Sequence, residues 1–99
     1  MPYFLYILLC NQKTYYVGIT DNLERRLNEH KGKKSFYTKQ FSDIEMVYSE
    51  KSISKIIAEK RELQIKGWSN AKKKALIQGN VKKLIRLSNG IEPDEVLDK

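Results

Sequence analysis

The chain has 99 residues, of which 40% are hydrophobic and 31% are charged, and its formal net charge is +7. This length suits one domain with a modest core, and the composition is too apolar for a disordered chain. Its apolar runs fall short of the about 20 residues that a membrane-spanning helix needs, so we expect no membrane partner. A single cysteine, Cys10, with a single histidine excludes both an internal disulfide and a zinc site built from these two residue types. We therefore expect a cytoplasmic globular protein.

The charge is unevenly distributed along the chain. Residues 91–99 hold four acids and one base, so the net charge divides into −3 there and +10 over residues 1–90. A small domain this basic is expected to bind a polyanion such as nucleic acid. The alternative is an ordinary lysine-rich surface. We expect residues 1–90 to form a single domain and residues 91–99 to be a flexible acidic tail.

The start of the chain predicts a β-hairpin. Residues 3–10 and 14–20 are rich in aromatic and β-branched side chains, which favour strands, and the polar break Asn11-Gln12-Lys13 between them has the length of a hairpin loop. Within the second predicted strand, Gly18 indicates either a bulge or a place where another group approaches the backbone.

A helix is predicted to follow the hairpin. Asp21 and Glu24 have the spacing of a capping box, and Gly32 is a typical terminator. Between them, Arg26 and His30 lie one helical turn apart, on the stripe next to the apolar face.

The rest of the chain predicts one more strand and three helices. Residues 43–49 alternate in polarity and predict a strand in which Ile44, Met46 and Tyr48 point the same way. The predicted helices cover residues 53–67 after the cap Ser52, residues 70–78 after the cap Ser69, and a short stretch after the cap Asn80. The apolar arc of the first of them contains Ile53, Ile56, Ile57 and Leu63. The order β-β-α-β-α-α-α predicts an α+β domain around a small, mainly antiparallel three-stranded sheet flanked by helices.

Residues 31–42, KGKKSFYTKQFS, form a basic loop with interleaved aromatic residues. One interpretation is a solvated connection. The other is a surface that follows a nucleic-acid strand, with lysines on phosphates and Phe36 or Tyr37 stacking on a base. The residues expected to contact nucleic acid are Lys33, Lys34, Tyr37, Thr38, Lys39, Lys66, Lys72 and Lys73.

Several of these features occur together in an order that resembles the GIY-YIG nuclease domain. The two motifs fall at Phe4-Leu5-Tyr6 and Tyr16-Val17-Gly18, with ten residues from one tyrosine to the other. Arg26 follows the second tyrosine by ten residues, and His30 comes one turn later. Glu62, four residues after Ala58, matches the metal-binding glutamate of that family. The resemblance covers about residues 3–78 and is to the small stand-alone bacterial form, which is similar to the N-terminal catalytic domain of the excision-repair incision nuclease.

Two positions depart from the family pattern. Phe4 stands where the first motif usually has glycine. Larger members also carry an asparagine after the glutamate, for which Asn70 is a candidate only by its proximity.

The resemblance implies roles for particular residues. Tyr6 would be the general base, and Tyr16 would orient the water or the phosphate. Arg26 would bind the phosphate with its planar fork of donors. His30 would hydrogen-bond a tyrosine oxygen or the phosphate, or shuttle a proton. Gly18 would be structural. Glu62 would hold one Mg²⁺ or Mn²⁺ ion, because a two-metal site needs several clustered acids.

The function implied is that of a divalent-metal-dependent endonuclease that hydrolyses DNA, with RNA possible, in repair or recombination and with weak sequence specificity. An alternative is a binding module of the same fold with little or no turnover, and a third is a protein-interaction domain whose charge is incidental. Taken singly, each residue also has a structural explanation: the tyrosines as hairpin core, Arg26 as an ion-pair partner, Glu62 as a solvated helix residue. We expect a monomer or a weak homodimer.

Overall fold

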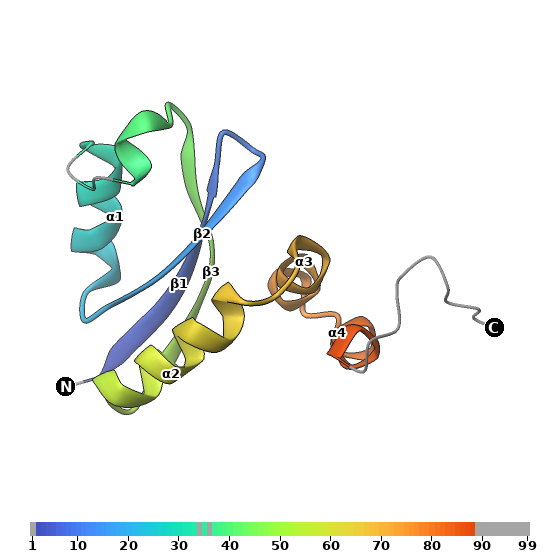
Figure 1. Ribbon diagram of the computed structural model, residues 1–99. Helices are drawn as coiled ribbons and strands as arrows, with labels where there is room; N and C mark the ends of the chain where they lie inside the picture. Colours follow the sequence, from blue (N-terminus) through green and yellow to red (C-terminus); the bar gives the residue numbers. More distant parts are fainter. Residues whose placement is uncertain (1, 34, 36, 89–99) are drawn as a thin grey trace. The chain divides into compact units, whose positions relative to one another are not determined.

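The structure, a computed structural model, describes residues 2–33, 35 and 37–88 (Figure 1). The predicted acidic tail, residues 91–99, lies outside these. The chain divides into two compact units, Met1–Gly67 and Trp68–Lys99. The elements follow the order β-β-α-β-α-α-α, with one additional short 3₁₀ helix, so the predicted α+β class is confirmed.

The first unit is built on an antiparallel sheet with the strand order β2-β1-β3. The strands are β1 (Tyr3–Cys10), β2 (Thr14–Thr20) and β3 (Ile44–Ser52). The predicted hairpin therefore has the observed bounds, and the third strand runs three residues further than predicted. Asn11 and Gln12 turn the hairpin with φ values of 52° and 56°. Two positive φ values in sequence are the geometry of a type I′ turn, whose twist matches that of the flanking strands.

An irregularity in the pairing of β1 with β3 changes the face of the sheet to which side chains of the third strand point. The register shifts between Ile7 and Leu8, so that Ile7 pairs with Tyr48 but Leu8 pairs with Met46. Directly paired residues point to the same face, and neighbours along a strand point to opposite faces. Met46 and Tyr48 therefore lie on opposite faces, and the prediction that they point the same way is wrong.

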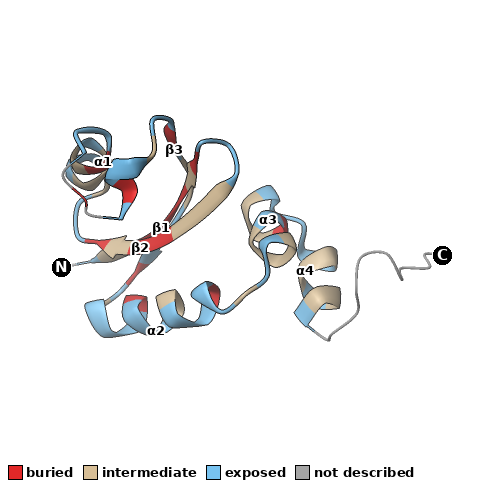
Figure 2. Ribbon diagram, turned by 45° about the horizontal axis from the view of Figure 1, so that its top comes forward, coloured by how far each residue is buried: buried red, intermediate tan, exposed pale blue. Residues whose placement is uncertain are grey.

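Helices α1 (Leu23–Lys31) and α2 (Lys55–Lys66) cover opposite faces of this sheet (Figures 1 and 2). Each begins later than predicted. Asn22, not Asp21, caps α1, and its side chain accepts from the backbone N–H of Arg25. Ser54, not Ser52, caps α2 and accepts from the N–H of Ile57. In both cases the cap is the residue whose extended backbone turns its side-chain oxygen towards the first helical turn.

The α1 face of the sheet buries Tyr6, Leu8, Cys10 and Ile44, against which the leucines of α1 pack. On α2 the buried residues are Ala58 and Ile65, whereas the predicted apolar arc faces solvent. The exposed fractions of that arc are 84% for Ile53, 64% for Ile56, 45% for Ile57 and 72% for Leu63. A small residue at position 58 instead lets the helix backbone approach the sheet closely.

The second unit pairs α3 (Asn70–Gln78) with α4 (Val81–Ser88). Ser69 caps α3, and Gly79 ends it with a φ of 70°, as the sequence predicts. Asn80 caps α4 by accepting from the N–H of Lys83. At the start of the unit, the Lys72 ammonium lies 4.4 Å from the centre of the Trp68 ring. Across the described residues of both units, no helix is long and apolar enough to span a membrane.

Candidate active site

Tyr6 lies in the central strand, and its hydroxyl reaches over Gly18 on the edge strand β2, the residue with which it pairs. A Cβ atom added to Gly18 would lie 2.6 Å from the Tyr6 oxygen, closer than any real contact allows. Of the two predicted explanations for this glycine, close approach is therefore the correct one. The glycine leaves the space in which the phenol oxygen sits.

Two nitrogen atoms of α1 lie within hydrogen-bond distance of that oxygen. Arg26 Nε donates to it at 3.2 Å, and His30 Nε2 lies 2.9 Å away. The Arg26 guanidinium is held in place by Glu29, one turn along the helix, with an Nη1 to Oε1 distance of 2.9 Å. The spacing of Arg26 and His30 along α1 thus brings both to one atom of the sheet.

His30 is wholly buried, and its other ring nitrogen meets Thr38. The distance from Nδ1 to the Thr38 hydroxyl oxygen is 2.6 Å, and Thr38 is also fully buried. Thr38 opens the short 3₁₀ helix Thr38–Gln40, whose fold back against α1 places the hydroxyl beside the ring. The sequence prediction that Thr38 contacts nucleic acid is corrected by this burial, because the side chain does not reach the surface.

A row of aromatic rings leads outwards from this cluster. The Tyr16 ring centre lies 6.4 Å from that of Tyr6 and 5.3 Å from that of His30. Tyr37 follows at 5.1 Å from Tyr16, and Phe41 at 6.0 Å from Tyr37. Tyr37 is 45% exposed, so it is the ring of this row on which a base could stack.

The electrostatics of the cluster follow from burial beside a fixed positive charge. Burial raises the pKa of Tyr6 to about 12, against the lowering effect of the Arg26 hydrogen bond. Burial, with the charge of Arg26, lowers the pKa of His30 to about 4. Hydrogen bonds to Tyr6 and Glu29 raise the pKa of Arg26. At neutral pH the cluster therefore holds a neutral phenol, a neutral imidazole and a guanidinium ion.

Glu62 comes from α2, on the other face of the sheet, and among the described residues its ion pair is with Lys66 and not with the cluster. Its negative charge nevertheless contributes to raising the pKa of Tyr6. The Tyr6 oxygen lies over the edge strand β2, and α2 packs on that strand, so the charge of Glu62 acts on Tyr6 from the other face of the sheet. The Glu62 side chain is 21% exposed and pairs with Lys66 at 3.1 Å.

This environment fits a single hard cation held through few protein ligands. Within the described ranges, no three His, Cys, Asp or Glu side chains gather as a metal-binding group. Mg²⁺ commonly keeps several waters and binds through one or two carboxylates and substrate phosphates. The partly exposed carboxylate of Glu62, which pairs with Lys66, is a ligand of this kind.

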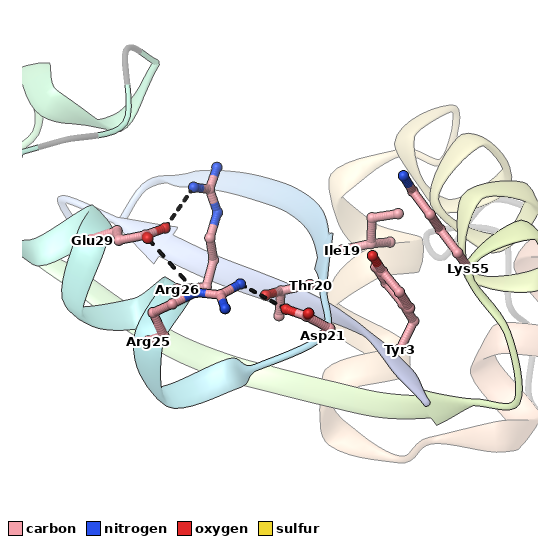
Figure 3. Close-up of a pocket in the computed structure, with 8 residues that line it drawn as sticks. All are labelled: Tyr3, Ile19, Thr20, Asp21, Arg25, Arg26, Glu29 and Lys55. Carbon is pink, nitrogen blue, oxygen red and sulfur yellow. Dashed lines mark hydrogen bonds and ion pairs between the residues drawn. The ribbon is translucent and has the colours of Figure 1, made fainter. Parts of the chain in front are cut away.

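A pocket of about 270 Å³ adjoins the cluster, since Arg26 lines it (Figure 3). Its wall continues with Arg25 of α1, Tyr3 of β1, Ile19 and Thr20 of β2, and Lys55 of α2. Arg25 is neutralised by Asp21 at 2.6 Å and approaches Glu29 at 3.7 Å. The Lys55 ammonium lies 6.0 Å from the centre of the Tyr3 ring. The pocket is thus lined by aromatic and aliphatic surface together with three basic and two acidic side chains, since Asp21 and Glu29 also line it.

The remaining predicted nucleic-acid residues are spread over both units. Lys33 and Lys39 are exposed in the basic loop, where the Lys33 ammonium donates to the backbone oxygen of Phe41. Lys34 lies outside the described residues. Lys66 is half-exposed beside Glu62, and Lys72 and Lys73 belong to the second unit.

Sequence reasoning missed two contributors to the cluster. Glu29 had a signal, because an acid three residues after an arginine on a helix is placed to pair with it. Thr38 had none: it stands in a lysine-rich loop, and only the folded chain reveals that its hydroxyl faces His30.

An α+β unit with an antiparallel sheet and with two tyrosines, an arginine and a histidine gathered beside it agrees with the resemblance to the GIY-YIG domain. The chain matches the family model described as the GIY-YIG catalytic domain over residues 2–75, and it belongs to that family.

Similar proteins carry the description UPF0213 protein. One from Natronomonas pharaonis is 41% identical over 76 residues, which cover 76% of this chain and 89% of that protein. One from Syntrophus aciditrophicus is 41% identical over 85 residues, covering 82% and 95%. The solution NMR structure of a UPF0213 protein from Bacillus halodurans is 30% identical, with a TM-score of 0.52, and covers 89% of this chain and 98% of that one.

Proposed function

We propose that the protein is an endonuclease that hydrolyses DNA phosphodiester bonds with one Mg²⁺ or Mn²⁺ ion. The observation that carries the proposal is the convergence of Arg26 Nε and His30 Nε2 on the Tyr6 oxygen, in space left by Gly18. Phosphodiester hydrolysis needs positive charge for the phosphate oxygens and an acceptor for the proton of the attacking water. The family assignment supports both the nuclease activity and the use of a divalent metal.

In this proposal each side chain of the cluster has a separate task. Arg26 remains charged and presents donors to the phosphate while its Nε holds the Tyr6 oxygen. Tyr6 receives the proton of the attacking water, Tyr16 orients that water or the phosphate, and Glu62 binds the ion. The ion, when bound, supplies further positive charge for the phosphate oxygens and lowers the pKa of nearby groups.

The phenol needs this help. With a pKa raised to about 12, Tyr6 is protonated at neutral pH in the protein alone. It can act as a base only when a cation nearby favours the phenolate. We therefore expect activity to depend strictly on the added metal ion and to rise with pH.

The substrate chemistry follows from the surroundings of the cluster. On one side, the pocket beside Arg26 would take the neighbouring nucleotide against Tyr3 and Ile19. On the other, the exposed Tyr37 ring would stack on a base, with Lys33 and Lys39 near the backbone phosphates. Stacking and phosphate contacts carry little sequence information. We propose weak sequence specificity and a role in DNA repair or recombination in the cytoplasm.

Cleavage assays with branched, nicked and linear DNA test this proposal. With Mg²⁺ or Mn²⁺, the substitutions Tyr6→Phe, Arg26→Ala and Glu62→Gln should each lower the rate by about 10²-fold or more. Two matched controls should cleave as the wild type does. Tyr15→Phe removes a tyrosine hydroxyl elsewhere on β2, and Glu59→Gln removes a carboxylate one turn away on α2. Cleavage at the wild-type rate by all three site variants would contradict the proposal.

A second candidate is a nucleic-acid-binding module of the same fold with little turnover. The pairing of Glu62 with Lys66 favours it, because the one carboxylate available for a metal ion already has a cationic partner. In this case Glu62→Gln should leave DNA or RNA affinity unchanged or improve it, since a negative charge is removed. Absence of cleavage together with salt-dependent binding would decide for this candidate.

A further inference from the structure

The buried contact between Thr38 and His30 has a consequence for the proton on Tyr6. Thr38, His30 and Tyr6 form a line of two hydrogen bonds, 2.6 Å from Thr38 Oγ1 to His30 Nδ1 and 2.9 Å from His30 Nε2 to the Tyr6 oxygen. All three residues are at most 1% exposed. The line connects the loop after α1 to the candidate active site.

This line contains three protons for two hydrogen bonds. The neutral imidazole brings one proton, and the two hydroxyl groups bring one each. The low pKa of His30, about 4, keeps the ring neutral over the working range. One hydroxyl proton is therefore left without a partner within the line, either at the Thr38 end or at the Tyr6 end.

The two ends differ in what they can offer a spare proton. Thr38 is fully enclosed, and His30 is its one side-chain hydrogen-bond partner among the described residues. The Tyr6 oxygen is buried too, but the negative charge of Glu62 favours a proton at that end. A buried donor without an acceptor is costly, so the spare proton belongs at the Tyr6 end, where a negative charge attracts it.

We infer that Thr38 is a positioning residue: its hydroxyl donates to His30 Nδ1 and so fixes the tautomer in which Nε2–H donates to the Tyr6 oxygen. The phenol oxygen then accepts from two N–H groups, those of Arg26 and His30, and its own proton is the one directed away from the line. Both donors would strengthen as Tyr6 becomes a phenolate, because hydrogen bonds to an ionised acceptor are the stronger ones. The inference rests on the proposed function only for its consequence for catalysis; the tautomer itself does not depend on it.

The tautomer can be observed directly, because the chain has one histidine. In a long-range ¹H–¹⁵N spectrum of the intact protein at pH 7, we expect Nε2 to resonate as the protonated nitrogen and Nδ1 as the unprotonated one. Thr38→Val should move the Nδ1 resonance to that of a ring nitrogen without a donor, whereas Thr38→Ser should retain the wild-type position. Thr14→Val, at the start of β2, serves as the control for removing a threonine hydroxyl elsewhere.

Cleavage kinetics then test what the tautomer does. Thr38→Val should lower the rate by about tenfold and shift the acidic limb of the pH profile upwards, since a weaker second donor raises the pKa of Tyr6. Thr38→Ser should restore both, and thermal unfolding should show that each variant is folded.

Two results would overturn the inference: a wild-type His30 protonated at Nδ1, or an Nδ1 resonance unaffected by Thr38→Val. A folded wild type with the expected tautomer that cleaves no DNA would instead reject the proposed function and leave the tautomer assignment standing.

Discussion

At the scale of single residues, Gly18 determines whether the Tyr6 hydroxyl has a place to lie. Gly18→Ala would put a methyl group 2.6 Å from the Tyr6 oxygen and 2.7 Å from the adjacent ring carbon. The ring must then move, which breaks its alignment with Arg26 and His30. We expect a loss of about 1–3 kcal/mol in unfolding free energy and a larger loss of cleavage, measured by chemical denaturation and DNA assays.

Gly67→Ala is the matched control for this substitution. Its added Cβ would lie 3.6 Å from the backbone oxygen of Gln64, an ordinary contact. Comparable effects of the two substitutions would show that the space beside Tyr6 is not the critical feature of Gly18.

His30 also makes the stability of the protein depend on pH. Its pKa is lowered from 6.5 to about 4 by burial and by the charge of Arg26, so between these values the unfolded chain binds the proton and the folded chain does not. Stability should therefore fall as the pH drops from 6.5 towards 4, by an amount on the order of 3 kcal/mol.

Denaturation between pH 5 and pH 7 checks this expectation above the range in which the carboxylates titrate. The His30→Gln variant should lose most of the dependence. A wild type whose unfolding free energy is flat across this interval would contradict the buried, neutral imidazole.

At the scale of elements, α2 is attached to the sheet through Arg61. Its Nε lies 2.8 Å from Glu50 on β3, and Glu50 in turn accepts from the Tyr48 hydroxyl at 2.6 Å. Glu62 is the next residue along the helix, so this ion pair helps to set the direction in which the carboxylate points. Two partly buried charges with a hydrogen-bonded neighbour form a stronger link than an isolated surface pair.

Glu50→Ala should therefore reduce activity from a distance. We expect a loss of about 1 kcal/mol in stability and a several-fold lower cleavage rate, with a weaker response to added Mg²⁺ because Glu62 is less well directed. Metal titrations of the cleavage rate provide the measurement. Unchanged metal dependence in a destabilised Glu50→Ala protein would limit the ion pair to a structural role.

The elements that the sequence predicted well are those specified by their own residues. The strands of the hairpin and the helix Asn70–Gln78 have local signals at both ends: polar turn residues in one case, Ser69 and Gly79 in the other. The face that α2 buries is not a local property. Ile56 and Ile57 suggest one side, but they are exposed, and Ala58 and Ile65 are buried while Arg61 pairs with Glu50 on β3.

The candidate site shows the same limit. The motif spacing identified Tyr6, Tyr16, Arg26 and His30 as candidates. This was possible because the hairpin and the following helix are close in sequence and in space. The positions of Glu62 and Thr38 depend on packing across the sheet and on the fold of a loop. Their roles therefore stay predictions that the proposed experiments must test.

At the scale of the whole molecule, a net charge of +7 should make nucleic-acid binding strongly dependent on salt. A plot of log affinity against log salt concentration should be steep, and Lys33→Gln or Lys39→Gln should each reduce its slope by about one if that lysine contacts a phosphate. Lys51→Gln, on the edge strand β3, is the control with an equal change in charge. Equal slopes for all three variants would indicate diffuse attraction without a defined path for the strand.

The solvent-facing isoleucines of α2 have a practical consequence. Since Ala58, Ile65 and the Arg61 ion pair hold this helix, its outer side contributes little to its orientation. Replacing Ile56 and Leu63 by lysine or glutamine should make the protein more soluble for crystallisation and spectroscopy. The position of the Glu62 carboxylate should not change. The solvent-exposed side of this helix therefore tolerates substitution, whereas the side that faces the strands does not.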